Sequence, residues 1–84
     1  MQLNSLLIEC NVTRIGEPEG ELAQLAVTNR GEPCTVIARV KNLEALGGLK
    51  AGRIIRVVGA LEAPDGVVRI VADHIELKPQ ARAE

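Results

Sequence analysis

The sequence has 84 residues, which is enough for one small domain with a limited core. Hydrophobic residues make up 46% of it and charged residues 25%, a balance that is typical of a globular domain and excludes intrinsic disorder. Ten basic and eleven acidic side chains give a net charge of −1, which excludes an overall positive field that would attract nucleic acid or an anionic membrane. Any such binding needs a local basic patch.

Phenylalanine, tyrosine and tryptophan are absent, so the core must be built from Val, Ile, Leu and Ala. The two cysteines, Cys10 and Cys34, lack the spacing and the histidine partners of a zinc site, and we expect free thiols in a reducing compartment. No apolar run approaches the ~18 residues of a membrane helix, and the first residues do not resemble a signal peptide. We therefore expect a cytoplasmic protein that does not associate with membranes.

The first half of the chain predicts three strands. Residues 4–13 alternate apolar and other side chains with the two-residue period of a half-buried strand. A solvated loop of residues 15–20 follows, with two glycines, a proline and two glutamates. Residues 22–29 alternate again, and residues 34–40 are rich in β-branched side chains. The short connection between them, residues 30–33, predicts a hairpin.

Residues 41–49 change to helical spacing, with leucines at positions 43, 46 and 49. We expect one short helix of about two turns, with Asn42 capping its start and Gly47-Gly48 ending it.

Residues 52–77 predict a second, long hairpin. Ile55, Val57 and Leu61 fall on one side of its first strand, and Gly59 marks a bulge or sharp bend, because a residue without Cβ tolerates close backbone approach. The turn is expected at residues 64–66, Pro-Asp-Gly, followed by a strand that begins at Val67. We expect the domain to comprise residues 1–78 and residues 79–84 to form a flexible tail.

Three strands, a short helix and two strands, joined by short links, predict an all-β fold. The layout is that of a five-stranded Greek-key barrel of OB type, with the helix between the third and fourth strands. An SH3-like barrel or a small open sheet also uses five short strands, but neither places a helix at that position.

Three segments resemble the single-stranded DNA-binding protein family of bacterial replication and, more loosely, its relative primosomal replication protein N. Residues 4–14, NSLLIECNVTR, resemble the opening strand of that family, and residues 42–53 resemble its helix and the entry to its fourth strand. Residues 57–62, VVGALE, and 71–77, VADHIEL, resemble its glycine-centred fourth strand and its closing strand. The resemblance implies an OB barrel, a homo-oligomer (dimer or tetramer) and binding of single-stranded DNA in replication, repair or recombination.

The chain also departs from that family. Sequence-tolerant binding of single strands combines a basic groove with aromatic platforms, and each stacked base contributes roughly 1 to 3 kcal/mol. Where the family usually has aromatic residues on the third strand, this chain has Cys34 and Val40, and the hairpin that carries another is cut down to residues 29–33. Three lost contacts would remove about 3 to 9 kcal/mol. We therefore expect weak, salt-sensitive binding.

The third strand gives two conflicting predictions. Its period turns Cys34, Val36, Ala38 and Val40 toward the core and Thr35, Ile37, Arg39 and Lys41 outward, whereas comparison with the family reverses the two sets. An inward Arg39 would bury an unpaired guanidinium at a high cost. We favour the period for the end of this strand and leave its start open.

If nucleic acid binds, strands two and three and the adjoining loops should form the surface. The expected phosphate contacts are Arg14, Arg30, Arg39, Lys41, Arg56 and Arg69. Arginine also stacks on bases, which would partly replace the missing rings. The alternative is a solvated face whose charge is balanced by Glu17, Glu19, Glu21, Glu32 and Glu62, and the sequence leaves both open.

Two classes of function remain open: a module that binds single-stranded DNA, and an OB domain that has lost strand binding and acts through an unidentified protein partner. We expect no enzyme, metal or cofactor, because the sequence supplies no nucleophile, metal cluster or cofactor loop. His74, the only histidine, has no second histidine or nucleophile placed with it, which favours a structural or exposed side chain over a ligand or base.

Overall fold

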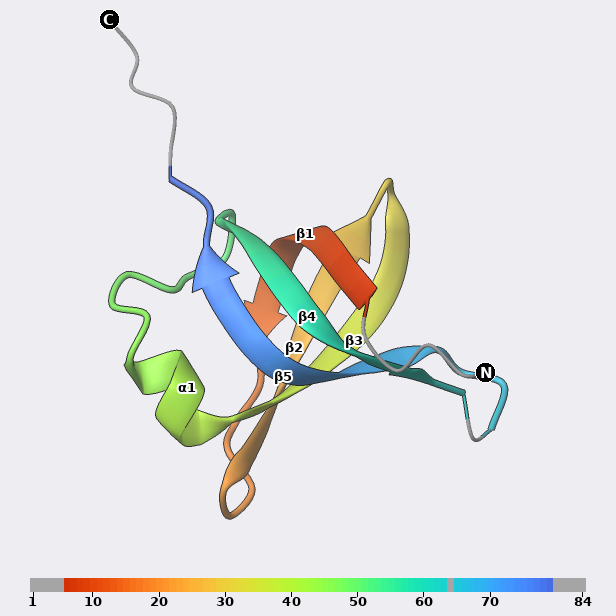
Figure 1. The fold of residues 1–84 in the computed structure, drawn as a ribbon, viewed down its shortest axis with the longest axis horizontal. Coiled ribbons are helices and arrows are strands. Elements are labelled where there is room, and N and C mark those ends of the chain that lie inside the picture. The colour runs from red at the N-terminus through yellow and green to blue at the C-terminus, as the bar shows by residue number, and fades with distance from the viewer. Residues whose placement is uncertain (1–5, 64, 80–84) are drawn as a thin grey trace, which may run out of the picture.

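The computed structural model describes residues 6–63 and 65–79 (Figure 1). Its elements, in chain order, are β1 (Leu6–Ile15), β2 (Leu22–Asn29), β3 (Glu32–Arg39), α1 (Val40–Glu44), β4 (Ile54–Glu62) and β5 (Arg69–Leu77). The strands close into a barrel in the order β1-β2-β3-β5-β4, with β4 paired to β1. All neighbours are antiparallel except β3 and β5, which run parallel. The predicted five-stranded barrel, with its helix between the third and fourth strands, is confirmed.

Some predictions concern residues outside the described ranges. These are the start of the first strand at residues 4 and 5, the proline of the second hairpin turn, Pro64, and most of the expected tail, residues 80–84. Among the described residues, no helix is long and apolar enough to cross a membrane.

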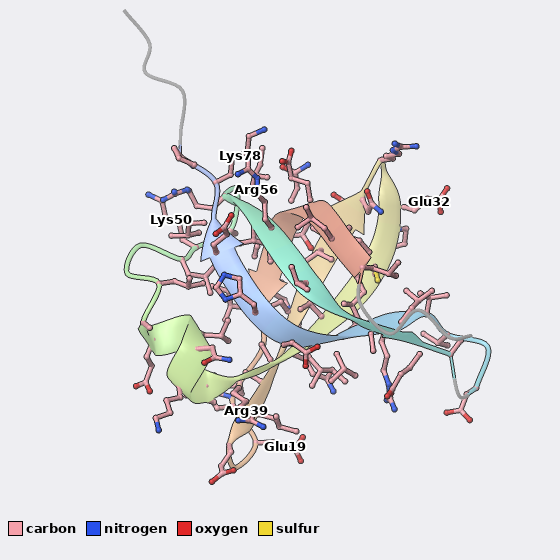
Figure 2. All side chains as sticks on the ribbon, viewed as in Figure 1. Glu19, Glu32, Arg39, Lys50, Arg56 and Lys78 are labelled. Carbon is pink, nitrogen blue, oxygen red and sulfur yellow. The ribbon has the colours of Figure 1, made fainter. Side chains whose placement is uncertain are left out.

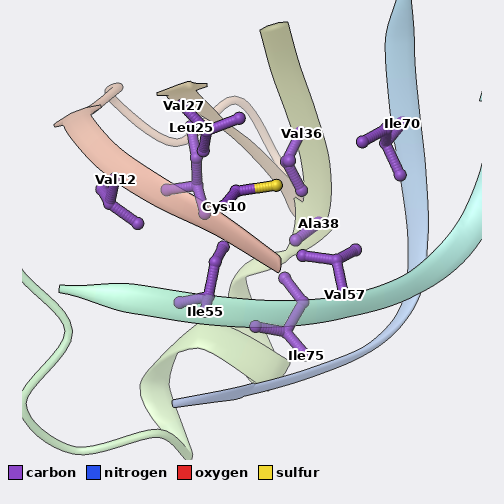
Figure 3. Close-up of a cluster of buried hydrophobic side chains, with 10 residues drawn as sticks. All are labelled: Cys10, Val12, Leu25, Val27, Val36, Ala38, Ile55, Val57, Ile70 and Ile75. Atoms are coloured by element: carbon purple, nitrogen blue, oxygen red, sulfur yellow. The ribbon is translucent and has the colours of Figure 1, made fainter. Parts of the chain in front are cut away.

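The barrel interior is filled by aliphatic side chains and one thiol from all five strands (Figure 3). The ten buried members of this cluster are Cys10, Val12, Leu25, Val27, Val36, Ala38, Ile55, Val57, Ile70 and Ile75. Burial raises the pKa of the Cys10 thiol to about 11, so it stays neutral at physiological pH and packs as an apolar group. The core therefore forms without aromatic residues, as the composition required.

The conflict over the third strand is resolved for its end. Val36 and Ala38 are 0% and 1% exposed, while Arg39 points to solvent, as the two-residue period predicts. The prediction for Val40 is wrong, because β3 ends at Arg39 and Val40, expected to face the core, is the partly exposed first residue of the helix. Cys34, at the start of the strand, is half-buried. The connection to β2 is shorter than expected, because β3 begins at Glu32 and only Arg30 and Gly31 lie between the strands. Both have positive φ, 54° and 82°, as a two-residue hairpin turn of type I′ requires.

The predicted helix start at Asn42 is wrong. The helix α1 begins two residues earlier at Val40, and no side chain caps it. The Val40 N–H instead donates to the Glu21 carbonyl at 2.8 Å, so the β1–β2 loop satisfies a group that a cap would otherwise satisfy. Gly47 and Gly48 follow the helix with positive φ, in a conformation that favours glycine.

The second hairpin differs from its prediction at both flanks of the turn. Val67 and Val68 were expected in the last strand, but β5 begins at Arg69 and these valines are 67% and 45% exposed. Leu61 was expected on the buried side with Ile55 and Val57, yet it is 53% exposed. The reason is that this end of the hairpin extends beyond the barrel (Figure 1), so no other strand covers it.

The predicted irregularity at Gly59 is confirmed. The pairing of β4 with β5 shifts between Val58, opposite His74, and Gly59, opposite Ala72, so that Asp73 is an extra residue on β5. A Cβ on Gly59 would overlap the Val71 carbonyl oxygen and stand 2.9 Å from the Ala72 Cα. Only glycine allows this close approach of the two strands.

Candidate nucleic-acid interface

Three adjoining hollows lie over the outer surface of β2 and β3, and Ile37 lines all of them. The largest, of about 620 Å³, lies between these strands and the β1–β2 loop. The others, of about 330 and 190 Å³, lie against β5 and beside the β4–β5 turn. Because they share lining residues, we treat them as one depression and call it the β2–β3 groove.

The alternation of β2 and β3 produces the floor of this groove. Inward-facing Ala23, Leu25 and Val27 fill the core, so their neighbours turn outward. Strand pairing then sets the outward side chains in rows: Gln24 beside Ile37 and Val71, Ala26 beside Thr35 and Arg69, and Leu22 beside Arg39. The floor is mainly aliphatic, with one amide and one hydroxyl near its middle.

Three of the six basic residues predicted from the sequence line the groove. Arg14 comes from β1, Arg39 from β3 and Arg69 from β5. Arg30 lies in the β2–β3 turn and Lys41 on α1, and neither lines the groove. Arg56 lies on β4, among carboxylates. The fold thus brings together half of the predicted set.

The groove also contains negative charge. Its lining includes four acidic residues, Glu17, Glu19, Asp65 and Asp73. The Arg69 guanidinium Nε lies 3.3 Å from the Glu62 carboxylate, whereas Arg14 and Arg39 form no ion pair within the described residues. Two guanidinium groups are therefore free to meet an anionic ligand, and the surrounding carboxylates weaken the positive field that they create.

Several lining residues had no role in the site predicted from the sequence. The sequence predicts that Thr35 and Ile37 face outward, but it gives them no contact with a ligand. For Leu22 and Gln24 it predicts only that they lie in a strand. The outward half of the alternation in strands two and three was the signal that identifies them. Asp65 and Asp73 gave no such signal, because the sequence predicted the turn and the bulge near them but not that these features lie beside β2 and β3.

A contrasting surface lies on β1, β4 and β5. Arg56 bonds Glu9 at 3.2 Å and lies 3.7 Å from Glu76, and the Lys78 ammonium bonds Glu9 at 3.0 Å. Figure 2 shows Arg56 and Lys78 side by side, well away from Arg39 and Glu19. Hydrogen bonds from Lys78, which has the larger effect, and from Arg56 hold the pKa of the Glu9 carboxyl below its usual value. We call this surface the ion-paired face.

The fold matches solved structures. A chain in the structure of a replication protein A heterotrimer bound to ssDNA superimposes with a TM-score of 0.76 at 15% identity, over 95% of this chain and 62% of that chain. The chain has an OB fold. The resemblance found in the sequence is thereby confirmed at the level of the fold.

Two further OB matches agree. One is the S. pombe Stn1-Ten1 complex, with a TM-score of 0.74 at 16% identity over 93% of this chain and 60% of that chain. The other is the dimeric N-terminal domain of the PriB protein from Thermoanaerobacter tencongensis, with a TM-score of 0.62 at 15% identity over 92% of this chain and 98% of that chain. The chain thus spans less than two thirds of the first two relatives. No family model and no curated protein sequence matches it.

In OB domains, the face of strands two and three, together with the loops after strands one and four, binds oligonucleotides and oligosaccharides. The β2–β3 groove occupies this surface. It is lined by Glu17 and Glu19 from the β1–β2 loop and by Asp65 and Val67 from the β4–β5 connection.

Proposed function

We propose that this chain is a non-catalytic OB module that binds single-stranded DNA weakly, in a salt-sensitive manner, along the β2–β3 groove. One observation carries the proposal: Arg14, Arg39 and Arg69, from three different strands, line a single groove with an aliphatic floor. Guanidinium groups bind phosphates and also stack on bases. The structural neighbours support it, since one was solved bound to ssDNA.

The expected affinity follows from the arginines that line the groove and from its lack of aromatic side chains. Arg14 and Arg39, which are unpaired among the described residues, can neutralise two phosphates, and each contact with a single strand contributes about −0.7 to the slope of log K against log salt. The slope should therefore be about −1.4. Without aromatic platforms, we expect dissociation constants of about 10⁻⁴ to 10⁻⁶ M, in the range of non-specific binding.

Fluorescence anisotropy with a labelled single-stranded oligonucleotide of mixed base sequence at low and high salt tests the proposal. Arg39→Gln should weaken binding and reduce the steepness of the salt dependence by about 0.7. Arg56→Gln is the matched control, because it removes the same charge from the ion-paired face and should leave binding unchanged. No binding at low salt, or equal losses for both variants, would exclude this function.

A second candidate is a protein-interaction module that has lost strand binding. Four acidic residues line the groove, and Glu62 pairs with Arg69, so negative charges outnumber the three arginines. Leu22 and Val67, 48% and 67% exposed, add apolar surface to the same groove. The anisotropy titration separates the two candidates, because absence of binding at low salt favours the protein contact.

We also propose that the chain self-associates as a dimer or tetramer. The support is apolar surface at the start of β1 and on the projecting hairpin, where Leu7, Leu61 and Val67 are 71%, 53% and 67% exposed. Burying such side chains against a second copy would stabilise the assembly. Light scattering across a concentration series should detect the oligomer, and a monomer at every concentration would refute it.

A further inference from the structure

The β1–β2 loop is fixed against one end of the β2–β3 groove. The Gly16 N–H donates to the Gln24 carbonyl at 2.8 Å, and Glu19 and Leu22 exchange backbone bonds of 2.7 and 3.2 Å. The approach at Gly16 is close, since a Cβ there would stand 2.8 Å from the Gln24 oxygen. These contacts hold the loop, and the side chains that it presents to the groove, next to β2.

Two acidic residues of the loop, Glu17 and Glu19, line the same hollow as Arg14, Gln24 and Thr35. Neither carboxylate forms an ion pair among the described residues, whereas Glu9, Glu62 and Glu76 all do. An ionised carboxylate only accepts hydrogen bonds, and it repels phosphate. A strand in this hollow must therefore turn its bases toward the loop and its phosphates toward the arginines.

This arrangement distinguishes between bases. Cytosine and adenine carry exocyclic amino groups that donate hydrogen bonds, while thymine carries none. Carboxylates accept from the amino group of cytosine, and a glutamine amide can pair with both the acceptor and the amino donor of adenine. Glu17 and Glu19 offer the first type of contact, and Gln24, beside Ile37 in the groove floor, offers the second.

We propose that the groove prefers single strands rich in cytosine or adenine over thymine strands, and that Glu17 and Glu19 determine the preference for cytosine. This inference rests on the proposed function. It adds a preference between bases that the arginines alone would not give, because phosphate contacts carry no sequence information.

Anisotropy titrations at low salt and pH 7.5 with cytosine, adenine and thymine strands of about 12 nucleotides, within the range of OB site sizes, measure the preference. We expect the cytosine and adenine strands to bind roughly fivefold or more tightly than the thymine strand. In the Glu17→Ala/Glu19→Ala double variant, thymine binding should strengthen because negative charge is lost. The ratio of cytosine to thymine affinity should then fall toward one.

The matched control is Glu21→Ala/Glu32→Ala. Both residues are exposed and neither lines the groove, so this variant removes the same charge and should keep the preference. Figure 2 shows Glu32 at the opposite end of the molecule from Glu19. Thermal melts should confirm that both variants fold.

Equal affinity for all three strands, or a cytosine preference that survives in Glu17→Ala/Glu19→Ala, would overturn this inference while leaving strand binding intact. A lack of binding by every strand would overturn the proposed function and, with it, the preference between bases.

Discussion

The two outer faces of this barrel carry the same charged residue types, arginine and acidic side chains, but pair them differently. On the ion-paired face, Arg56 lies between Glu9 and Glu76, and Lys78 reaches the same Glu9. In the β2–β3 groove, Arg14 and Arg39 have no such partners among the described residues. The position of an arginine in the strand register, rather than the number of arginines, therefore decides which charges remain available to a ligand.

Strand β5 contributes to both faces. Its first part pairs with β3 and presents Arg69 and Val71 beside the groove, and its second part presents Glu76 to Arg56. The bulge at Asp73, opposite Gly59, lies between the two parts. An extra residue reverses which side the following residues face, and so it allows one strand to serve two surfaces.

The largest expected effect comes from breaking this bulge with Gly59→Ala. The added Cβ would overlap the Val71 carbonyl oxygen, so β4 and β5 must separate. We expect a loss of about 3 kcal/mol or more in the free energy of unfolding, at the upper end of the cost of overpacking. Chemical denaturation followed by circular dichroism measures it.

Gly20→Ala is the matched control for this substitution. Gly20 has a positive φ of 63°, but no atom lies within 4 Å of the position that a Cβ would take. Its substitution should cost only about 1 to 2 kcal/mol, the penalty for a left-handed backbone with a side chain. Gly59 does not have a positive φ, so any excess loss must come from the close approach of β4 to β5, and equal losses for the two variants would contradict the prediction.

The next largest effect should come from giving the groove the aromatic platform that it lacks. Ile37 lines all three hollows, so Ile37→Phe places a ring in the middle of the groove. One stacked base contributes roughly 1 to 3 kcal/mol, so affinity for single strands should rise about five- to 150-fold. Anisotropy titration measures the gain directly.

Val58→Phe tests whether the gain belongs to the groove. Val58 is partly exposed on β4, opposite Leu7 of β1 and His74 of β5, and so lies with the ion-paired face. A ring there should leave strand affinity unchanged. If both variants, or neither, bind more tightly, the β2–β3 groove is not the binding surface.

The sequence predicted the fold well because the barrel is specified by local signals. Alternation identified β2 at its observed bounds, and the composition of the second turn and Gly59 identified the long hairpin. The predicted start of α1 was wrong because the Val40 N–H donates its hydrogen bond to the Glu21 carbonyl, which lies nineteen positions earlier in the chain. The exposed Val67 was missed because alternation cannot show where a hairpin leaves the barrel.

The candidate site was less predictable than the fold. Burial and period placed Arg39 outward, but only strand pairing shows that Arg39 and Arg69 share a groove while Arg56 does not. Arg56 and Glu9 are 47 positions apart, and no sequence pattern predicts that they form an ion pair. Cross-strand register therefore had to be seen before the ligand-facing charges could be separated from the paired ones.

The smallest effect concerns the pH dependence of the ion-paired face. Lys78 and Arg56 lower the pKa of Glu9 below its ordinary value of 4.5, so the folded state favours the ionised carboxylate. The resulting stabilisation is fully present above pH 4.5 and is lost as the pH falls through the lowered pKa. Glu9→Gln should therefore show a smaller loss of melting temperature than the natural chain over this acidic window.

Added salt should shrink the difference between Glu9→Gln and the natural chain, because the Glu9 carboxylate is 45% exposed and its interactions are screened. Glu32→Gln is the control, since Glu32 forms no ion pair within the described residues and lies on the β2–β3 hairpin. It should retain the acid sensitivity of the natural chain. Identical acid profiles for all three proteins would mean that the ion pairs of Glu9 add nothing to stability. The contrast between the two faces would then lie only in which arginines are free to bind.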